Sequence, residues 1–275
     1  MLQALTFDVT GTLIHSPRLG EIYSEVLRRH GIAIEPAEAR RLVGVVWREL
    51  ACLADPGRDR FTSHPEGERG WWRRFVERLC ELHGASPPSR FAAAELFHRF
   101  GSPAGWEVYP EVPRVLAELR EQGLRLGVIS NWDGRLPGLL DKLGLARHFD
   151  TVTYSAAAGV EKPDRRIFLQ ALRSLGVAPE AALHIGDGRL EDVEGAIAAG
   201  LRALQLDRVD RPEAEERRPT GGRSRAGKAA PGSGKKGGAE PAEARRLRNL
   251  AGLPYWVATE ARWLAEGGPG SVLDL

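Results

Sequence analysis

The segment Phe7-Asp8-Val9-Thr10-Gly11-Thr12-Leu13 carries the strongest indication of the fold. It continues an apolar, strand-like run over residues 2–7 and places an acidic side chain, Asp8, directly after it. Gly11 allows a tight turn at that point. In open parallel sheets, side chains at the carboxyl ends of the strands line the crevice where ligands bind. The segment therefore predicts a ligand-facing carboxylate.

Strand-like apolar runs recur along the chain, and most lead into a segment with helical periodicity. The runs cover residues 2–7, 124–129, 183–185 and 201–206, with a weaker run at 149–154. The helical segments cover residues 112–122, 136–143, 166–175 and 190–199, and they are followed by Gly123, Gly144, Gly176 and Gly200. Glycine is typical just after a helix, where a left-handed residue ends it. Alternating strands and helices predict an α/β fold with a Rossmann-like parallel sheet covered on both faces.

Residues 19 to 100 interrupt this alternation, because their pattern is helical throughout. Apolar stripes at helical spacing include Ile22, Leu42 and Trp71. A block of helices inserted after the first strand predicts a separate small domain over residues 16–104. The core that contains the sheet is then expected to be discontinuous, formed by residues 1–15, 105–208 and 246–265.

Residues 211–243 have a different composition from the rest of the chain. They contain Gly-Gly, Pro-Gly-Ser-Gly and Lys-Lys-Gly-Gly, with almost no large apolar side chains. Such a segment buries too little surface to offset the entropy of ordering it, so we expect a flexible basic surface insertion. A basic segment can contact an acidic partner. A solvated tether is the simpler interpretation, and no nucleic-acid partner is expected.

Bulk composition excludes several classes of protein. The 275 residues are 42% hydrophobic and 28% charged, with a net charge of +2, as is ordinary for a globular chain. No apolar run approaches the ~18 residues that indicate a membrane span, and no basic leader is visible. The two cysteines, Cys52 and Cys80, lack metal-type spacing and are expected to be reduced. We therefore predict a cytoplasmic protein with no membrane partner; the oligomeric state stays open.

Polar side chains recur near the ends of the later strands. Ser130 and Asn131 follow the second run, Lys162 lies between the weaker run and its helix, and Asp187 follows another run with Asp192 five residues later. Because parallel strands end at one edge of a sheet, we expect these groups to meet the first carboxylate. Two carboxylates held close together repel each other unless one is protonated or they share a cation. An oxygen-rich pair of this kind suits Mg²⁺.

The order of these groups resembles the four motifs of the haloacid dehalogenase superfamily. The matching residues are Asp8-x-x-Gly11-Thr12, Ser130, Lys162-Pro163 and Gly186-Asp187-x4-Asp192. The helical insertion between the first two motifs resembles the small helical cap of that family. The resemblance implies a Mg²⁺-dependent phosphatase acting on a small phosphorylated metabolite, in which Asp8 attacks phosphorus and forms an aspartyl-phosphate.

The resemblance also implies a role for each matched residue. Ser130 would donate a hydrogen bond to a phosphoryl oxygen, and Lys162 would neutralise charge on Asp8 and the phosphoryl group. The expected metal site comprises Asp8, the Thr10 carbonyl, Asp187 and Asp192, with Asp192 acting through water or orienting Lys162. The expected catalytic set is Asp8, Thr10, Ser130 and Lys162, and the expected substrate-binding set is Thr12, Ser130, Asn131 and Lys162. Simpler interpretations stay open: Ser130 as a helix N-cap, Asn131 as a loop cap, and Asp192 as a first-turn helix acid.

Thr10 departs from the family pattern. Phosphatases of this superfamily usually carry a second aspartate there, which protonates the leaving group and later activates water. A hydroxyl is a poor general acid or base, and such catalysis contributes ~10²–10⁴-fold. We therefore expect slow turnover of ordinary phosphomonoesters. Two other hypotheses stay open: a non-catalytic or regulatory binding protein on the same scaffold, and a 2-haloacid dehalogenase, which the acidic fourth motif disfavours.

Overall fold

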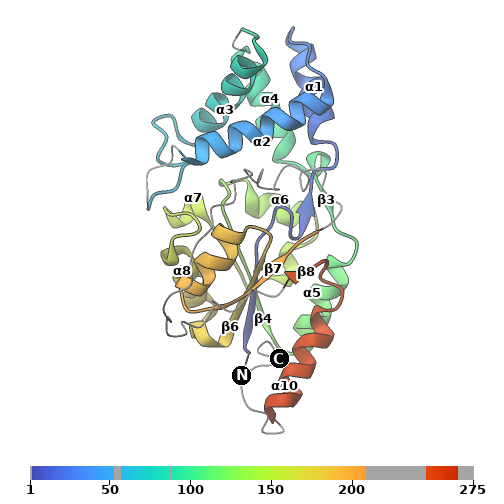
Figure 1. Cartoon of the computed structure of the whole chain (residues 1–275), viewed down its shortest axis with the longest axis vertical. Coiled ribbons are helices and arrows are strands. Elements are labelled where there is room, and N and C mark those ends of the chain that lie inside the picture. The colour runs from blue at the N-terminus through green and yellow to red at the C-terminus, as the bar shows by residue number, and fades with distance from the viewer. Residues whose placement is uncertain (1, 53–56, 87, 209–245, 266–275) are drawn as a thin grey trace, which may run out of the picture.

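The structure is a computed structural model that describes residues 2–52, 57–86, 88–208 and 246–265. A six-stranded, fully parallel sheet forms its centre, in the order β5-β4-β1-β6-β7-β8. The strands are β1 (Ala4–Phe7), β4 (Arg125–Ser130), β5 (Thr151–Tyr154), β6 (Ala182–Gly186), β7 (Arg202–Leu206) and β8 (Arg246–Leu247). Helices flank this sheet (Figure 1), which confirms the predicted α/β class with a Rossmann-like core.

Successive side chains of β1 point to opposite faces of the sheet and so enter two separate apolar clusters. Leu5 and Phe7 belong to a cluster with α5, α6 and α10, and Ala4 belongs to a second cluster with α8 and α9. These helices are α5 (Val112–Glu121), α6 (Leu136–Lys142), α8 (Arg165–Leu175), α9 (Gly195–Ala198) and α10 (Leu253–Ala265). Burial of both faces holds the strand ends, and thus the site, on a rigid base.

The predicted strand and helix bounds agree closely with the structure. The glycines expected after four helices all have positive φ, namely Gly123, Gly144, Gly176 and Gly200. The segment expected as one helix over 190–199 is instead a π-helical turn, η4 (Arg189–Glu194), followed by α9. The remaining short elements are α7 (Ser155–Ala158), η1 (Pro103–Gly105), η2 (Ala146–His148) and η3 (Pro179–Ala181).

The described residues between 19 and 100, called the helical region below, have helices joined by loops and no strands. They are α1 (Leu19–Arg29), α2 (Pro36–Cys52), α3 (Gly67–His83) and α4 (Arg90–Phe100). These helices share an apolar cluster of their own, in which Phe75 and Leu79 are fully buried. In Figure 1 the helical region lies over one end of the main sheet, beyond the carboxyl end of β1.

A second, two-stranded sheet forms where the chain enters and leaves the helical region. Its strands are β2 (Ile14–His15) and β3 (Glu107–Val108), which pair antiparallel. The ring of Tyr109 stacks on His15 with 4.3 Å between centroids. Neither strand was predicted, because two residues are too few to show a period of alternation. The pairing brings the two connections of the helical region side by side.

The predicted basic insertion, 211–243, lies outside the described residues, as does the side chain of Cys52. Cys80 is a buried free thiol, and burial raises its pKa to about 11. In the part of the chain that the structure describes, none of the helices has the length and apolar character needed to cross a membrane.

Candidate active site

Asp8 lies at the carboxyl end of β1, where the backbone reverses direction. Gly11 has φ of 82° and donates its N–H to the Ile14 carbonyl at 2.7 Å. Glycine adopts this left-handed conformation without the steric cost that a Cβ would add. The turn leaves Asp8 only 7% exposed, at the floor of a cavity.

Lys162 is the buried cation of the site. Its Nζ donates to Asp8 Oδ1 at 2.7 Å, to Asp192 Oδ1 at 2.5 Å and to the Ile129 carbonyl at 2.9 Å, which accounts for all three ammonium donors. Ser130 Oγ donates to the same Asp8 oxygen at 2.8 Å. Burial alone would lower the pKa of Lys162, but the charges of Asp192 and Asp8 outweigh burial and raise it well above its ordinary value. The group is therefore a permanent cation next to the candidate nucleophile.

Asp192 has hydrogen-bond partners on both carboxylate oxygens. Besides Lys162, its Oδ1 lies 3.2 Å from His184 Nε2, and its Oδ2 accepts the Gly188 N–H at 2.7 Å. Burial would raise the pKa of Asp192, but the Lys162 charge and the His184 bond lower it below its usual range. Gly186 permits this packing, since a Cβ there would lie 2.2 Å from Asp192 Cγ. Asp192 is thus placed to hold Lys162.

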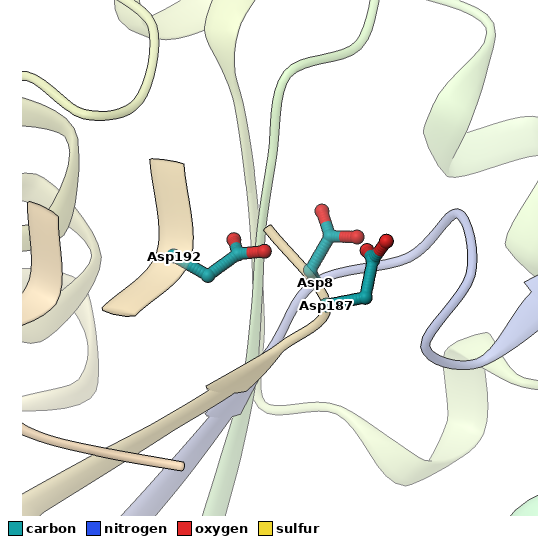
Figure 2. A group of neighbouring side chains, drawn as sticks. All are labelled: Asp8, Asp187 and Asp192. Carbon is teal, nitrogen blue, oxygen red and sulfur yellow. The ribbon is translucent and has the colours of Figure 1, made fainter. Parts of the chain in front are cut away.

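Three carboxylates lie close together at the end of the sheet, in a group that could hold a divalent cation. Asp8, Asp187 and Asp192 each offer one oxygen, and these oxygens lie within 4.8 Å of one another. Figure 2 shows the Asp8 and Asp187 carboxylates side by side, with Asp192 reaching toward them from η4. An all-oxygen donor set with a repelling carboxylate pair suits a hard cation such as Mg²⁺. The residues present therefore fit the expected metal.

Thr10 lies on the wall of the cavity, two residues after Asp8. Its Oγ1 accepts a hydrogen bond from Trp132 Nε1 at 3.1 Å. Sequence reasoning did not single out Trp132, because an indole within a loop carries no chemical pattern of its own. The bond helps to orient the Thr10 hydroxyl on the wall of the cavity.

Asn131 was predicted to bind substrate, but its amide is bonded to the backbone of Lys162. Asn131 Nδ2 donates to the Lys162 carbonyl at 3.0 Å, and Asn131 Oδ1 accepts the Lys162 N–H at 2.7 Å. This two-point contact helps to hold the loop that carries the lysine. Asn131 also borders the cavity, so its contact with substrate stays a prediction.

The structure does not bring Thr12, the other predicted substrate contact, to the cavity. The residue is fully buried, and its Oγ1 has no hydrogen-bond partner among the described residues. Its carbonyl accepts a bond from Arg208 Nη2 at 2.8 Å. Thr12 is not among the residues that line the cavity, and its contact with substrate stays a prediction.

The site opens into a cavity of about 1290 Å³ between the end of the sheet and the helical region. Asp8, Ser130, Lys162 and Asp187 line it from the sheet side. Small-molecule sites usually measure about 300–1,000 Å³, so this cavity has room for a small ligand and for water beside it. The structure therefore brings together the predicted groups at 8, 10, 130, 162, 187 and 192.

Comparison with known proteins agrees with this arrangement. Residues 2–200 match the haloacid dehalogenase-like hydrolases, and the chain belongs to this family of hydrolases. It is 38% identical over 207 residues to human haloacid dehalogenase-like hydrolase domain-containing protein 3, covering 74% of this chain and 81% of that protein. It is 32% identical over 227 residues to a glyceraldehyde 3-phosphate phosphatase of Methanopyrus kandleri, covering 79% and 89%. An L-2-haloacid dehalogenase from Xanthobacter autotrophicus shares the fold, with a TM-score of 0.63, 21% identity and coverage of 94% and 99%.

Proposed function

We propose that this hydrolase is a Mg²⁺-dependent phosphatase that acts on a small phosphorylated metabolite through an aspartyl-phosphate on Asp8. The observation that carries the proposal is the double contact of Lys162 Nζ with Asp8 at 2.7 Å and Asp192 at 2.5 Å. It keeps a cation beside the carboxylate that must approach an anionic phosphoryl group. The relative named as a phosphatase supports phosphorus as the atom attacked.

The proposed reaction has two steps on the Asp8 carboxylate. In the first, an Asp8 oxygen attacks phosphorus, an O–P bond forms to Asp8, and the bond to the leaving-group oxygen breaks. That oxygen leaves with a proton drawn from water. In the second, water attacks phosphorus, the O–P bond to Asp8 breaks, and inorganic phosphate and the free carboxylate result.

The other residues hold charge and position during these steps. Asp8, Asp187 and the Thr10 carbonyl would hold Mg²⁺, which when bound offsets negative charge on the phosphoryl oxygens. Lys162 neutralises charge on Asp8 and on the transferred group. The Ser130 hydroxyl donates a hydrogen bond to Asp8 in this structure. Rotation of the hydroxyl would instead direct this donor to a phosphoryl oxygen. Asp192 orients Lys162 and would contact the metal through water.

We further propose that the helical region is a cap that closes over a discontinuous core of residues 1–15, 105–208 and 246–265. Hydrogen bonds between the helical region and the core support this: Trp72 donates to Asp133 at 2.6 Å, and Arg60 donates to Glu161 at 2.6 Å. Closure would exclude bulk water from Asp8 and limit the substrate to the size of the cavity.

A panel of phosphorylated metabolites with Mg²⁺ tests the proposal, together with detection of a BeF₃⁻ adduct by ¹⁹F NMR. We expect phosphate release that EDTA removes and added Mg²⁺ restores. Asp8→Asn should abolish both release and adduct, while Asp141→Asn, a change on the exposed side of α6, should leave both intact. Chloride release from a 2-chloro acid in EDTA, without phosphate release, would contradict the proposal and favour a dehalogenase.

A further inference from the structure

The helical region gives the cavity a basic wall. Among its described residues that line the cavity, the charged side chains are Arg40, Arg48 and Arg60, with no carboxylate. Aromatic rings such as Trp47 and Phe61 fill much of the remaining wall. The carboxylates that line the cavity all come from outside the helical region, such as Asp8 and Asp187 at the sheet end. The far end of a bound substrate would thus meet positive charge.

Arg60 is held by a largely buried ion pair. Its Nε and Nη2 donate to the two oxygens of Glu161 at 2.6 and 3.0 Å, and its guanidinium lies 5.1 Å from the centre of the Trp47 ring. The Arg60 side chain is 7% exposed. Such a fixed guanidinium is preorganised, so it can bind an anion with little further loss of side-chain conformational entropy.

The remaining nitrogen of Arg60, Nη1, is buried and has no hydrogen-bond partner among the described residues. A buried donor without an acceptor is unfavourable, and more so when the group is charged. Arg60 lines the cavity, so a small shift of its side chain would expose Nη1 there, and a ligand oxygen would then supply the missing acceptor.

The position of Glu161 relates this arginine to the reaction. Glu161 directly precedes Lys162, whose Nζ is bonded to Asp8. The loop that carries the catalytic cation therefore also anchors Arg60. Asp8 and Arg60 line the same cavity, so the leaving group of a substrate with its phosphoryl group at Asp8 would share that cavity with Arg60.

We propose that Arg60 binds a carboxylate on the leaving group, so that the substrates are small phosphomonoesters that carry a second, carboxylate anion. The inference rests on the proposed phosphatase function and names its substrate class. Arg40 and Arg48 add positive charge to the same wall, and a planar carboxylate matches the fork of a guanidinium. The competing explanation is that the Arg60–Glu161 pair only holds the helical region against the core.

Binding of non-hydrolysable ligands separates these explanations without relying on turnover. Calorimetric titrations with Mg²⁺ would compare phosphonoacetate with ethylphosphonate, and phosphonopropionate with propylphosphonate. In each pair, we expect the wild type to bind the ligand that carries a carboxylate about 10- to 100-fold more tightly than the alkyl ligand. This is the gain expected from a hydrogen bond between charged groups. An ethylene bisphosphonate tests a second phosphate in place of the carboxylate and should bind less tightly than phosphonopropionate.

Four variants complete the experiment. Arg60→Gln should remove the carboxylate preference, and Arg60→Lys, which keeps the charge, should retain part of it. Glu161→Gln frees the arginine from its counter-charge and should preserve or increase the preference. Arg74→Gln is the matched control, because Arg74 pairs with Glu81 on α3 outside the cavity.

The outcomes that overturn the proposal are specific. If Arg60→Gln and Glu161→Gln weaken the binding of carboxylate and alkyl ligands by the same factor, the Arg60–Glu161 pair only holds the helical region against the core. If the bisphosphonate binds more tightly than phosphonopropionate, the carboxylate assignment is wrong. Failure of the wild type to release phosphate from any ester would end the proposed function, yet the binding preference would still be measured.

Discussion

Trp72 on α3 donates its indole N–H to Asp133 Oδ2 at 2.6 Å, which joins the helical region to the loop after β4. Asp133 is 1% exposed and also accepts bonds from Arg135, whose guanidinium lies 5.2 Å from the Trp72 ring centre. Glu68, one helical turn before Trp72, accepts the Gly134 N–H at 2.8 Å. This loop begins directly after Ser130. The contact therefore couples the position of the helical region to the position of a residue that touches Asp8.

Trp72→Phe should weaken this contact while leaving the ring in the wall of the cavity. The indole bond to a carboxylate is lost, so we expect KM to rise by roughly 5- to 30-fold. The helical region should also be cleaved faster in limited proteolysis, because the closed arrangement is less favoured. Trp256→Phe on α10, which packs against the apolar cluster of Leu5 and Phe7 and does not line the cavity, is the control. An unchanged KM with unchanged proteolysis would show that the bond does not hold the closed state.

Asn131→Leu should lower kcat more than it raises KM. The variant loses both hydrogen bonds to the Lys162 backbone, so the loop carrying the ammonium is held less firmly. A displaced cation stabilises the transition state less well, and we expect kcat to fall about 10- to 100-fold. Steady-state kinetics with one phosphate ester measures this, and Ser174→Ala on α8 serves as the control. An increase in KM alone would instead indicate the direct substrate contact first predicted for Asn131.

The groups that converge on the site were largely predictable from the sequence, and the reason is geometric. Asp8, Ser130 and Asp187 each follow a strand-like run, and parallel strands end at the same edge. Lys162 lies on the loop between β5 and α8, so it reaches the same edge. Once the sheet was predicted to be parallel, their proximity followed without further information.

The residues that hold those groups were not predictable, since their roles depend on contacts across long stretches of chain. His184 sits within β6 and looks like any strand residue, yet it bonds Asp192 and lies 2.9 Å from Thr6 Oγ1. Arg60 is one arginine among many until Glu161 is placed beside it. Thr12 was assigned to substrate because of its motif, but the conformation of the turn buries it.

Acid should destabilise the protein through His184. Burial, more than any neighbour, lowers the pKa of this fully buried imidazole below its usual value. The unfolded chain, with a histidine pKa of about 6.5, therefore binds the proton first, and the free energy of unfolding falls as pH drops below that value. Urea unfolding across this range should show the fall, and His184→Gln should make it shallower.

A second histidine provides a control of opposite sign. The hydrogen bonds of His83 to Glu38 and to the Ala33 carbonyl raise its pKa. The stabilisation that protonated His83 gives the folded state is therefore complete below about pH 6.5. It is lost as the pH rises through the pKa of His83 in the folded protein. His83→Gln should thus leave the acid-side fall intact. A fall of equal steepness in wild type and His184→Gln would show that another group governs it.

Thr10→Asp should speed the hydrolysis of esters with poor leaving groups. The Thr10 hydroxyl accepts a bond from Trp132 Nε1 and cannot act as an effective acid near neutral pH, so an alkoxide must leave without a local proton donor. A carboxyl group on the cavity wall would supply that proton, and we expect kcat for an alkyl phosphate to rise about 10- to 100-fold. Acetyl phosphate, whose leaving group needs little protonation, should gain much less. Thr10→Asn places an amide of similar shape there and should give no gain. If the wild type already hydrolyses both esters at similar rates, the proton comes from elsewhere and Thr10 does not limit turnover.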